Sequence, residues 1–126
     1  MRMGSIYSDV ILDHFRNPRN YGRIDLPDAA HEDLNPLCGD RIRMELKMKR
    51  GEVEIVRFTG NGCAITMASA SILTEQVKGV DIRNRDAISQ SELLTLLKAS
   101  IKESRMRCVT LPLDVLNRAI EIWRSK

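Results

Sequence analysis

The sequence predicts an α+β domain in which a small three-stranded antiparallel sheet packs against about four to five helices. Residues 41–49 alternate apolar and charged side chains, as a strand with one buried face does, and a tight turn follows at Arg50-Gly51. Apolar residues at helical spacing occur on both sides of this hairpin. Because the chain has 126 residues, of which 43% are hydrophobic, we expect residues 1–126 to form a single domain.

A first helix is predicted near the N-terminus. Its apolar face is formed by residues spaced i, i+3, i+4 and i+8, namely Tyr7, Val10, Ile11 and Phe15. Ser5 is a suitable N-cap, and Asn17 followed by Pro18 is expected to end the helix. His14 lies beside the apolar face, so we interpret it as a partly buried structural histidine and not as a metal ligand.

Residues 41–49 are predicted to form a strand with one face toward the core and one toward water. The apolar residues of one face are Ile42, Met44, Leu46 and Met48, and the charged residues of the other are Arg43, Glu45 and Lys47. Residues 53–59 should return as the hairpin partner of this strand. The segment between Pro27 and Pro36, which contains Ala29, Ala30 and Leu34, is interpreted as an edge strand.

Three helices are expected in the second half of the chain. A segment of small residues begins at Ala64 and ends at Gly79, and its apolar face contains Ile65, Ala68, Ile72 and Val77. Residues 89–92 read as a capping box for a helix that carries Leu93, Leu94, Leu96, Leu97 and Ile101. The last helix contains Leu113, Leu116, Ile120 and Trp123, with Pro112 in its first turn, where proline is tolerated.

Composition narrows the classes of partner. The formal net charge is only +3, and two Phe, two Tyr and one Trp are few for base stacking, so we expect no nucleic-acid partner. No run of about 18 apolar residues occurs, so no membrane span is predicted. The sequence does not open with a basic segment followed by an apolar stretch. We therefore expect a cytoplasmic protein whose three cysteines are reduced thiols.

Each of the three cysteines is expected at a junction between elements. Cys38 precedes the alternating strand, Cys63 lies between the hairpin and a helix, and Cys108 lies between two predicted helices. The glycines beside Cys38 and Cys63 allow the backbone to approach a cofactor closely. If Cys63 opens its helix, the exposed N–H groups and the helix dipole lower the pKa of its thiol and favour the thiolate, which is the form that binds metal.

Asp40 is a candidate fourth ligand. Residues two apart in an extended segment point to the same side, so Cys38 and Asp40 can approach one metal ion. Three thiolates and one carboxylate suit tetrahedral Zn²⁺ or an iron–sulfur cluster, and the oxygen ligand would make a cluster easier to release. However, the cysteines form no paired C-x-x-C motif, and free cysteines are often small buried hydrophobes. The spacing alone leaves both interpretations open.

Four stretches of the sequence resemble the NifU N-terminal/IscU/SufU family. They are residues 7–20, Asn35-Pro36 leading to Cys38-Gly39-Asp40, residues 60–71 around Cys63, and Cys108 with the final helix. The resemblance implies a scaffold that receives sulfur from a PLP-dependent cysteine desulfurase and builds a transient 2Fe-2S cluster. The cluster would then be transferred to apo iron–sulfur acceptor proteins. The resemblance also implies that the ligands of the cluster, of Fe or of Zn²⁺ are Cys38, Asp40, Cys63 and Cys108.

The chain departs from the family pattern in three places. Arg107 stands where IscU-type members carry a histidine before the third cysteine. Residues 101–106 lack the proline-containing segment that a specialised Hsp70 chaperone reads, so this chaperone is not a predicted partner. Both changes are similar to SufU, yet the interval between Cys63 and Cys108 is too short for the insertion that SufU carries. Arg107 could either favour the neighbouring thiolate or be a solvated charge.

A zinc-dependent sulfurtransferase similar to SufU is the alternative function. In that case Cys38 would accept persulfide sulfur and would be the catalytic residue. A domain with a purely structural Zn²⁺ is a third interpretation, which the junction positions of the cysteines disfavour. Arg107 favours the sulfurtransferase, whereas the missing insertion favours the scaffold. We therefore prefer a non-enzymatic scaffold and keep the sulfurtransferase as its alternative.

Overall fold

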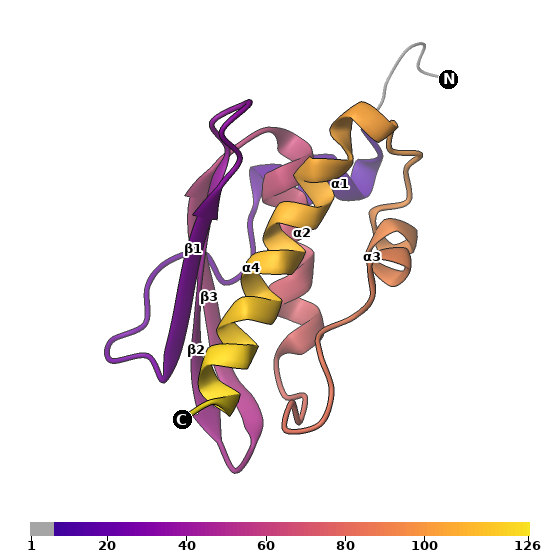
Figure 1. Ribbon diagram of the computed structural model, residues 1–126. Helices are drawn as coiled ribbons and strands as arrows, with labels where there is room; N and C mark the ends of the chain where they lie inside the picture. The colour runs from indigo at the N-terminus through magenta and orange to yellow at the C-terminus, as the bar shows by residue number, and fades with distance from the viewer. Residues whose placement is uncertain (1–6) are drawn as a thin grey trace.

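The computed structural model describes residues 7–126, which adopt the expected α+β fold. Strands β1 (Ala29–Leu34), β2 (Arg41–Lys49) and β3 (Glu52–Asn61) form one antiparallel sheet in the order β1-β2-β3. Within the described residues, four α-helices lie to one side of the sheet (Figure 1): α1 (Asp9–Arg16), α2 (Ala64–Val77), α3 (Gln90–Leu97) and α4 (Met106–Arg124). The short 3-10 helix η1 (Glu103–Arg105) precedes α4. None of these helices is long and apolar enough to cross a membrane.

The predicted hairpin is confirmed, but the outer face of β2 is less exposed to solvent than its charged residues predict. Ile42, Met44 and Leu46 are fully buried against the helices, as their alternation predicts. Glu45, on the opposite face, was expected to meet water, yet it is only 1% exposed. The segment that follows α1 covers it: Glu45 accepts hydrogen bonds from the Arg23 side chain and the Ile24 backbone, both at 2.6 Å.

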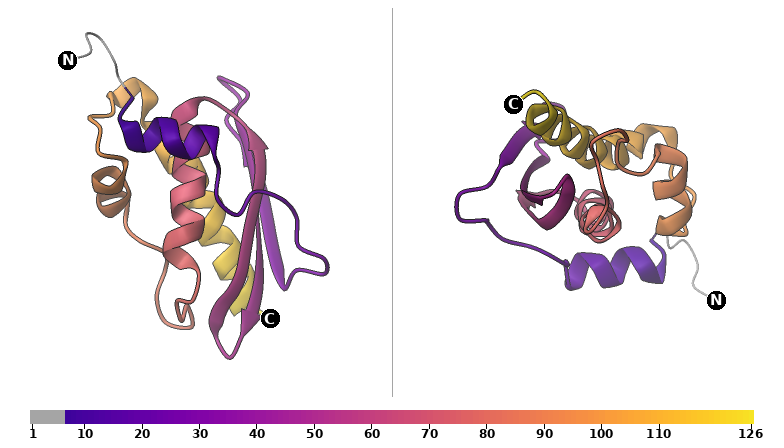
Figure 2. Two further views of the ribbon diagram at one scale, coloured as in Figure 1. Left: turned by 180° about the vertical axis from the view of Figure 1, so that it is seen from behind. Right: turned by 90° about the horizontal axis from the view of Figure 1, so that it is seen from below.

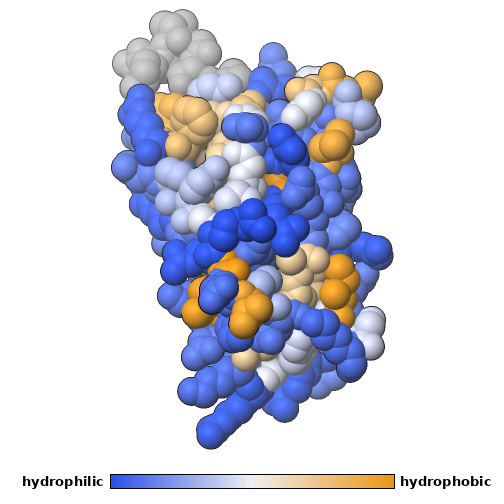
Figure 3. Space-filling view, turned by 90° about the vertical axis from the view of Figure 1, so that its left-hand side faces the viewer, coloured by the Kyte–Doolittle hydropathy of each residue, from blue (hydrophilic) through white to orange (hydrophobic). Residues whose placement is uncertain are grey.

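The outer face of the sheet is otherwise mainly hydrophilic, as Figure 3 shows for the side of the molecule that carries it. The segment after α1 reaches this face along the free edge of β3. There the Phe58 N–H donates to the Asn20 carbonyl at 3.0 Å, and the Gly22 N–H donates to the Phe58 carbonyl at 2.9 Å. The alternating pattern of β2 does not predict that Glu45 is buried. The segment after α1 that buries it is irregular and has no sequence periodicity that would place it on the sheet.

Helix α2 lies in the middle of the molecule, enclosed by the sheet, α4, α3 and α1 (Figure 2). Its small residues permit this close packing, and most of the helix is buried, including Ala68, Ser69, Ala70 and Ser71. The sequence predicts one apolar face for α2, but the buried part of the helix extends well beyond that face. The helix ends at Val77, and Gly79 follows with a φ of +83°, which confirms the predicted stop.

The ends of the other helices confirm some caps and correct others. Ser5 lies outside the described residues, and Ser8 is the N-cap of α1, accepting a hydrogen bond from the Ile11 N–H. The capping box of Ser89 and Glu92 is present at α3. That helix ends at Leu97, so it does not extend to Ile101 as expected.

Helix α4 begins earlier than predicted. It starts at Met106, which places Cys108 in its first turn and not in a loop between two helices. Pro112 consequently lies inside the helix, beyond the first turn where we expected it. Because proline has no N–H, the carbonyl of Cys108, four residues earlier, has no helical hydrogen-bond partner.

Candidate metal centre

Three of the four predicted ligands meet at one end of the sheet. Asp40 immediately precedes β2, and Cys63 follows β3 as the N-cap of α2. The pairing of Arg41 with Asn61 brings these two strand ends side by side. The first turn of α4 supplies Cys108. One oxygen of Asp40 and the sulfurs of Cys63 and Cys108 lie within 4.8 Å of one another.

The two sulfurs are in direct contact. Cys63 Sγ and Cys108 Sγ are 3.4 Å apart, and neither cysteine forms a disulfide. Ligands of one tetrahedral Zn²⁺ lie roughly 3.5–4 Å from each other. Two soft sulfur donors and one hard oxygen at this spacing fit Zn²⁺ or iron, and they leave room for a further ligand.

Cys38 is exposed and does not belong to this group of three. It lies in a short loop whose ends are joined by a hydrogen bond from the Asn35 N–H to the Asp40 carbonyl at 2.7 Å. The Asn35 side chain accepts from the Leu37 N–H at 3.0 Å, which is an Asx turn. Gly39, with a φ of +79°, completes the turn. The loop therefore presents Cys38 to solvent, outside the group of three. Metal ligation by any of the four residues stays a prediction.

Thr66 is a site residue that the sequence analysis missed. It is fully buried in the first turn of α2, and its Oγ1 donates a hydrogen bond to Asp40 Oδ2 at 2.6 Å. The same oxygen lies 3.5 Å from Cys63 Sγ. A signal was available in the sequence, because a residue three positions after an N-cap lies beside the cap side chain.

Gly62 allows this close approach of Asp40 and Thr66. A Cβ atom placed on Gly62 would lie 3.0 Å from the side chain of Thr66 and 3.1 Å from Asp40 Cγ. Both distances are tighter than ordinary contacts, so a larger residue would push the carboxylate and the hydroxyl apart. The glycine predicted to allow close backbone approach is therefore needed for packing inside the site.

The two grouped thiols differ in acidity. Burial raises the pKa of Cys63, but its contacts with the side chain and the backbone N–H of Thr66 and with the Arg105 guanidinium outweigh that effect and bring the pKa below its ordinary value. Burial raises the pKa of Cys108, and the neighbouring Cys63 adds to this increase. The Cys63 thiol is therefore the first of the two to become a thiolate.

Arg105 is the cation beside these sulfurs, and the sequence analysis did not identify it. The Arg105 side chain hydrogen-bonds to Cys63 and Cys108, which raises the pKa of its guanidinium. Arg107 forms an ion pair with Asp114 at 2.8 Å on the surface of α4. This pairing supports the interpretation of Arg107 as a solvated charge.

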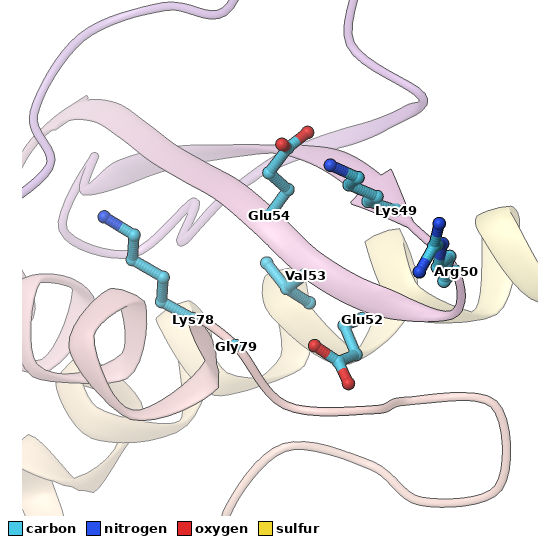
Figure 4. A pocket seen from close by; sticks show the side chains of 7 residues that line it. All are labelled: Lys49, Arg50, Glu52, Val53, Glu54, Lys78 and Gly79. Carbon is cyan, nitrogen blue, oxygen red and sulfur yellow. The ribbon is translucent and has the colours of Figure 1, made fainter.

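A separate pocket of about 400 Å³ lies at the opposite end of the β2–β3 hairpin. It is lined by Lys49, Arg50, Glu52, Val53, Glu54, Lys78 and Gly79, whose side chains point in different directions (Figure 4). Both cationic and anionic side chains line it, and no cysteine or histidine does. This pocket therefore lacks the sulfur donors found at the end of the sheet that carries Cys63 and Cys108.

Known proteins resemble this chain over nearly its whole length. The family model of the NifU-like N-terminal domain matches residues 6–126. The zinc-dependent sulfurtransferase SufU of Bacillus subtilis is 35% identical, and the match covers 94% of this chain and 91% of SufU. The iron–sulfur cluster assembly scaffold protein IscU 1 of Archaeoglobus fulgidus is 36% identical, with 91% of this chain and 74% of that protein covered.

The solved structures agree on the fold. A protein from Fervidobacterium islandicum, described as a "putative iron-sulfur cluster assembly scaffold protein for SUF system", superposes with a TM-score of 0.76. It shares 24% sequence identity with this chain, and 91% of this chain and 96% of that structure are covered. The alignment with Bacillus SufU spans 136 positions, more than the 126 residues of this chain, so SufU contains internal residues that this chain lacks.

Proposed function

Because this chain belongs to the family of NifU-like N-terminal domains, we propose that it is a scaffold for iron–sulfur cluster assembly. It would receive sulfur from a cysteine desulfurase, build a transient 2Fe-2S cluster and pass that cluster to apo acceptor proteins. The observation that carries this proposal is the group of Asp40, Cys63 and Cys108, whose ligand atoms lie within 4.8 Å of one another. These thiols need a reducing compartment such as the cytoplasm.

The exposed position of Cys38 suits the sulfur-receiving step. A thiolate of Cys38 would attack the outer sulfur of a persulfide on the desulfurase, forming a new S–S bond to Cys38. The bond between the two donor sulfurs breaks, and the desulfurase cysteine leaves as a thiolate. A thiol reductant, such as the excess free cysteine, would then supply two electrons that cleave the new S–S bond, which regenerates the Cys38 thiolate, releases sulfide and leaves the reductant as a disulfide. The sulfide would bind iron held by Asp40, Cys63 and Cys108.

Cluster release would depend on the mixed donor set. A carboxylate oxygen binds iron in a cluster more weakly than a thiolate does, because iron–sulfur sites favour soft sulfur ligands. Asp40 is therefore the ligand that can leave first when an acceptor protein offers its own cysteines. A fourth protein thiolate in its place would favour retention of the cluster.

A zinc-dependent sulfurtransferase is the second candidate function. The likeness to Bacillus SufU and the exposure of Cys38 support it. The internal residues that SufU has and this chain lacks support the scaffold. Zinc would have opposite effects in the two cases, because it activates a sulfurtransferase but occupies the iron site of a scaffold.

The decisive experiment is anaerobic reconstitution with a cysteine desulfurase, cysteine and Fe²⁺. For a scaffold we expect visible absorption of a 2Fe-2S cluster, two irons per cluster and only slight stimulation of the desulfurase. For a sulfurtransferase we expect strong, zinc-dependent stimulation, lost in Cys38→Ser, and no cluster under iron excess. That second result would overturn the scaffold proposal.

A further inference from the structure

Thr66 connects two of the three grouped ligands. Its hydroxyl lies 2.6 Å from Asp40 Oδ2 and 3.5 Å from Cys63 Sγ. Thr66 is fully buried, and Asp40 is only 8% exposed, so water does not easily replace this hydrogen bond. Among residues 7–126, Thr66 is the side chain that donates a hydrogen bond to the Asp40 carboxylate.

We infer that Thr66 is a positioning residue whose hydroxyl holds Asp40 beside Cys63 and Cys108, so that a metal ion meets three ligands already in place. This inference deepens the proposed function, since it concerns the same metal centre. Thr66 itself is not a ligand, because its short hydrogen bond is directed at the carboxylate.

The chemistry of a hydroxyl explains the arrangement. A threonine hydroxyl carries one proton, and the 2.6 Å distance assigns that proton to Asp40. The hydrogen bond uses one lone pair of the carboxylate, on Oδ2, and the other lone pairs of its two oxygens remain for a metal ion. The carboxylate is therefore held in place while it can still bind a metal ion, and Cys63 Sγ lies 3.5 Å from the same hydroxyl oxygen.

The position of Thr66 is rigid enough for this role. Helix α2 lies between the sheet and the other three α-helices (Figure 2), and Thr66 is a fully buried, β-branched residue with few accessible rotamers in a helix. Asp40, by contrast, precedes its strand at the end of an exposed loop. Within the described part of the chain, no arginine, lysine or histidine forms an ion pair with Asp40, so the Thr66 hydroxyl is the side-chain contact that orients it.

The test is anaerobic Co²⁺ titration followed by the thiolate-to-metal and d–d absorption bands, which requires neither a desulfurase nor a cluster. Thr66→Val removes the hydroxyl and keeps the shape, and we expect its Co²⁺ affinity to fall by about 10- to 100-fold. Thr66→Ser restores the hydroxyl and should restore the affinity. Ser69→Ala is the matched control, because its hydroxyl is buried in the same helix without a hydrogen-bond partner and its loss should leave the affinity unchanged.

A double-mutant cycle separates positioning from a general packing effect. Once Asp40→Ala has removed the carboxylate, Thr66→Val should cause no further loss of Co²⁺ affinity. An equal loss in both backgrounds, or wild-type affinity and spectrum in Thr66→Val, would overturn the inference. If Thr66→Val does not fold, Thr66→Ala takes its place in the cycle, and the same results would support or overturn the inference. A wild-type protein that binds Co²⁺ in this Thr66-dependent way but builds no cluster would refute only the scaffold proposal.

Discussion

At the scale of single residues, the site depends on the absence of a side chain as much as on the ligands. The space that Asp40 and Thr66 share is available only because position 62 is glycine. Cys63, the next residue, must then serve as the N-cap of α2, although it makes no side-chain capping hydrogen bond. Its thiol lies near the positive end of the helix dipole, where a thiolate is stabilised.

The residue-scale prediction is that Gly62→Ala weakens metal binding more than it weakens the fold. The added Cβ would meet Thr66 at 3.0 Å and Asp40 Cγ at 3.1 Å, so the carboxylate must shift. We expect the Co²⁺ affinity to fall by at least about tenfold. Competitive Co²⁺ titration and thermal unfolding of the metal-free protein measure the two effects separately.

Gly79→Ala is the control for this prediction, and it should show the reverse pattern. Gly79 has a φ of +83°, and a Cβ added to it would meet no atom within 4 Å, at the far end of α2 from the cysteines. Alanine there costs about 1–2 kcal/mol of backbone strain, so stability should fall while Co²⁺ affinity stays unchanged. Equal affinity losses in the two variants would show that the effect of Gly62→Ala is not local.

At the scale of helices and strands, a buried polar contact joins α1 to α2. His14 Nδ1 lies 2.7 Å from Ser71 Oγ, and the same hydroxyl accepts a hydrogen bond from the Arg19 N–H at 2.9 Å. Burial lowers the pKa of His14, and the nearby charge of Arg19 lowers it further, although Glu75 and Asp13 act in the opposite direction. The interpretation of His14 as a structural residue agrees with these contacts.

At this scale we predict that lowering the pH destabilises the fold, because protonation of His14 disfavours its buried contact with Ser71. The pKa of His14 is lower in the folded protein than its unfolded value of about 6.5, so the unfolded chain binds the proton more readily. The His14 contribution to stability is therefore complete above that pH and is lost as the pH falls from about 6.5 through the folded pKa. Urea unfolding at several pH values between about 5 and 7.5 measures this slope.

His14→Gln should flatten the pH dependence of the unfolding free energy in that window. The lost stability amounts to about 1.4 kcal/mol for each unit by which the folded and unfolded pKa values differ. His31→Gln is the matched control, since the other histidine lies on β1 away from this contact. An unchanged slope in His14→Gln would mean that other groups cause the acid sensitivity.

The elements differ, for physical reasons, in how well their sequence predicts them. Strand β2 has the predicted bounds because alternation follows directly from burial of one face. Ser5 and Ser8 have the same capping chemistry, so the sequence cannot show that Ser8 is the cap of α1. Pro112 suggests a first turn and so misplaces the start of α4, whereas packing against α2 and the sheet holds a helix that contains this proline.

At the scale of the whole molecule, the candidate metal centre joins parts of the chain that are distant in sequence. Asp40 precedes β2, Cys63 begins α2 and Cys108 lies in the first turn of α4. The resemblance to a known family named these residues, but their spacing alone could not bring them together. Thr66 lies in the family-like stretch around Cys63, but no ligand role marks it there, and Arg105 lies outside every such stretch. The packing of α2 and of the segment before α4 brings both residues to the cysteines.

This arrangement predicts that metal stabilises the whole domain, since one ion would connect β2, α2 and α4. A ligand present at 100 times its dissociation constant stabilises the native state by about 2.7 kcal/mol if the unfolded chain does not bind it. We expect Zn²⁺ to raise the free energy of unfolding by about this amount, and a chelator to reverse the effect. Chemical denaturation under reducing conditions, with and without Zn²⁺, measures it.

Single cysteine replacements show which sulfurs carry this stabilisation. Cys63→Ser and Cys108→Ser should each abolish most of it, because each removes a ligand and disconnects a helix from the metal. Cys38→Ser should lose less, since Cys38 lies in an exposed loop outside the group of three. Equal losses in all three variants would instead show that the loop closes over the metal and that Cys38 is a full structural ligand. Such a site would hold Cys38 on the metal, so sulfur transfer to Cys38 would first require that bond to break.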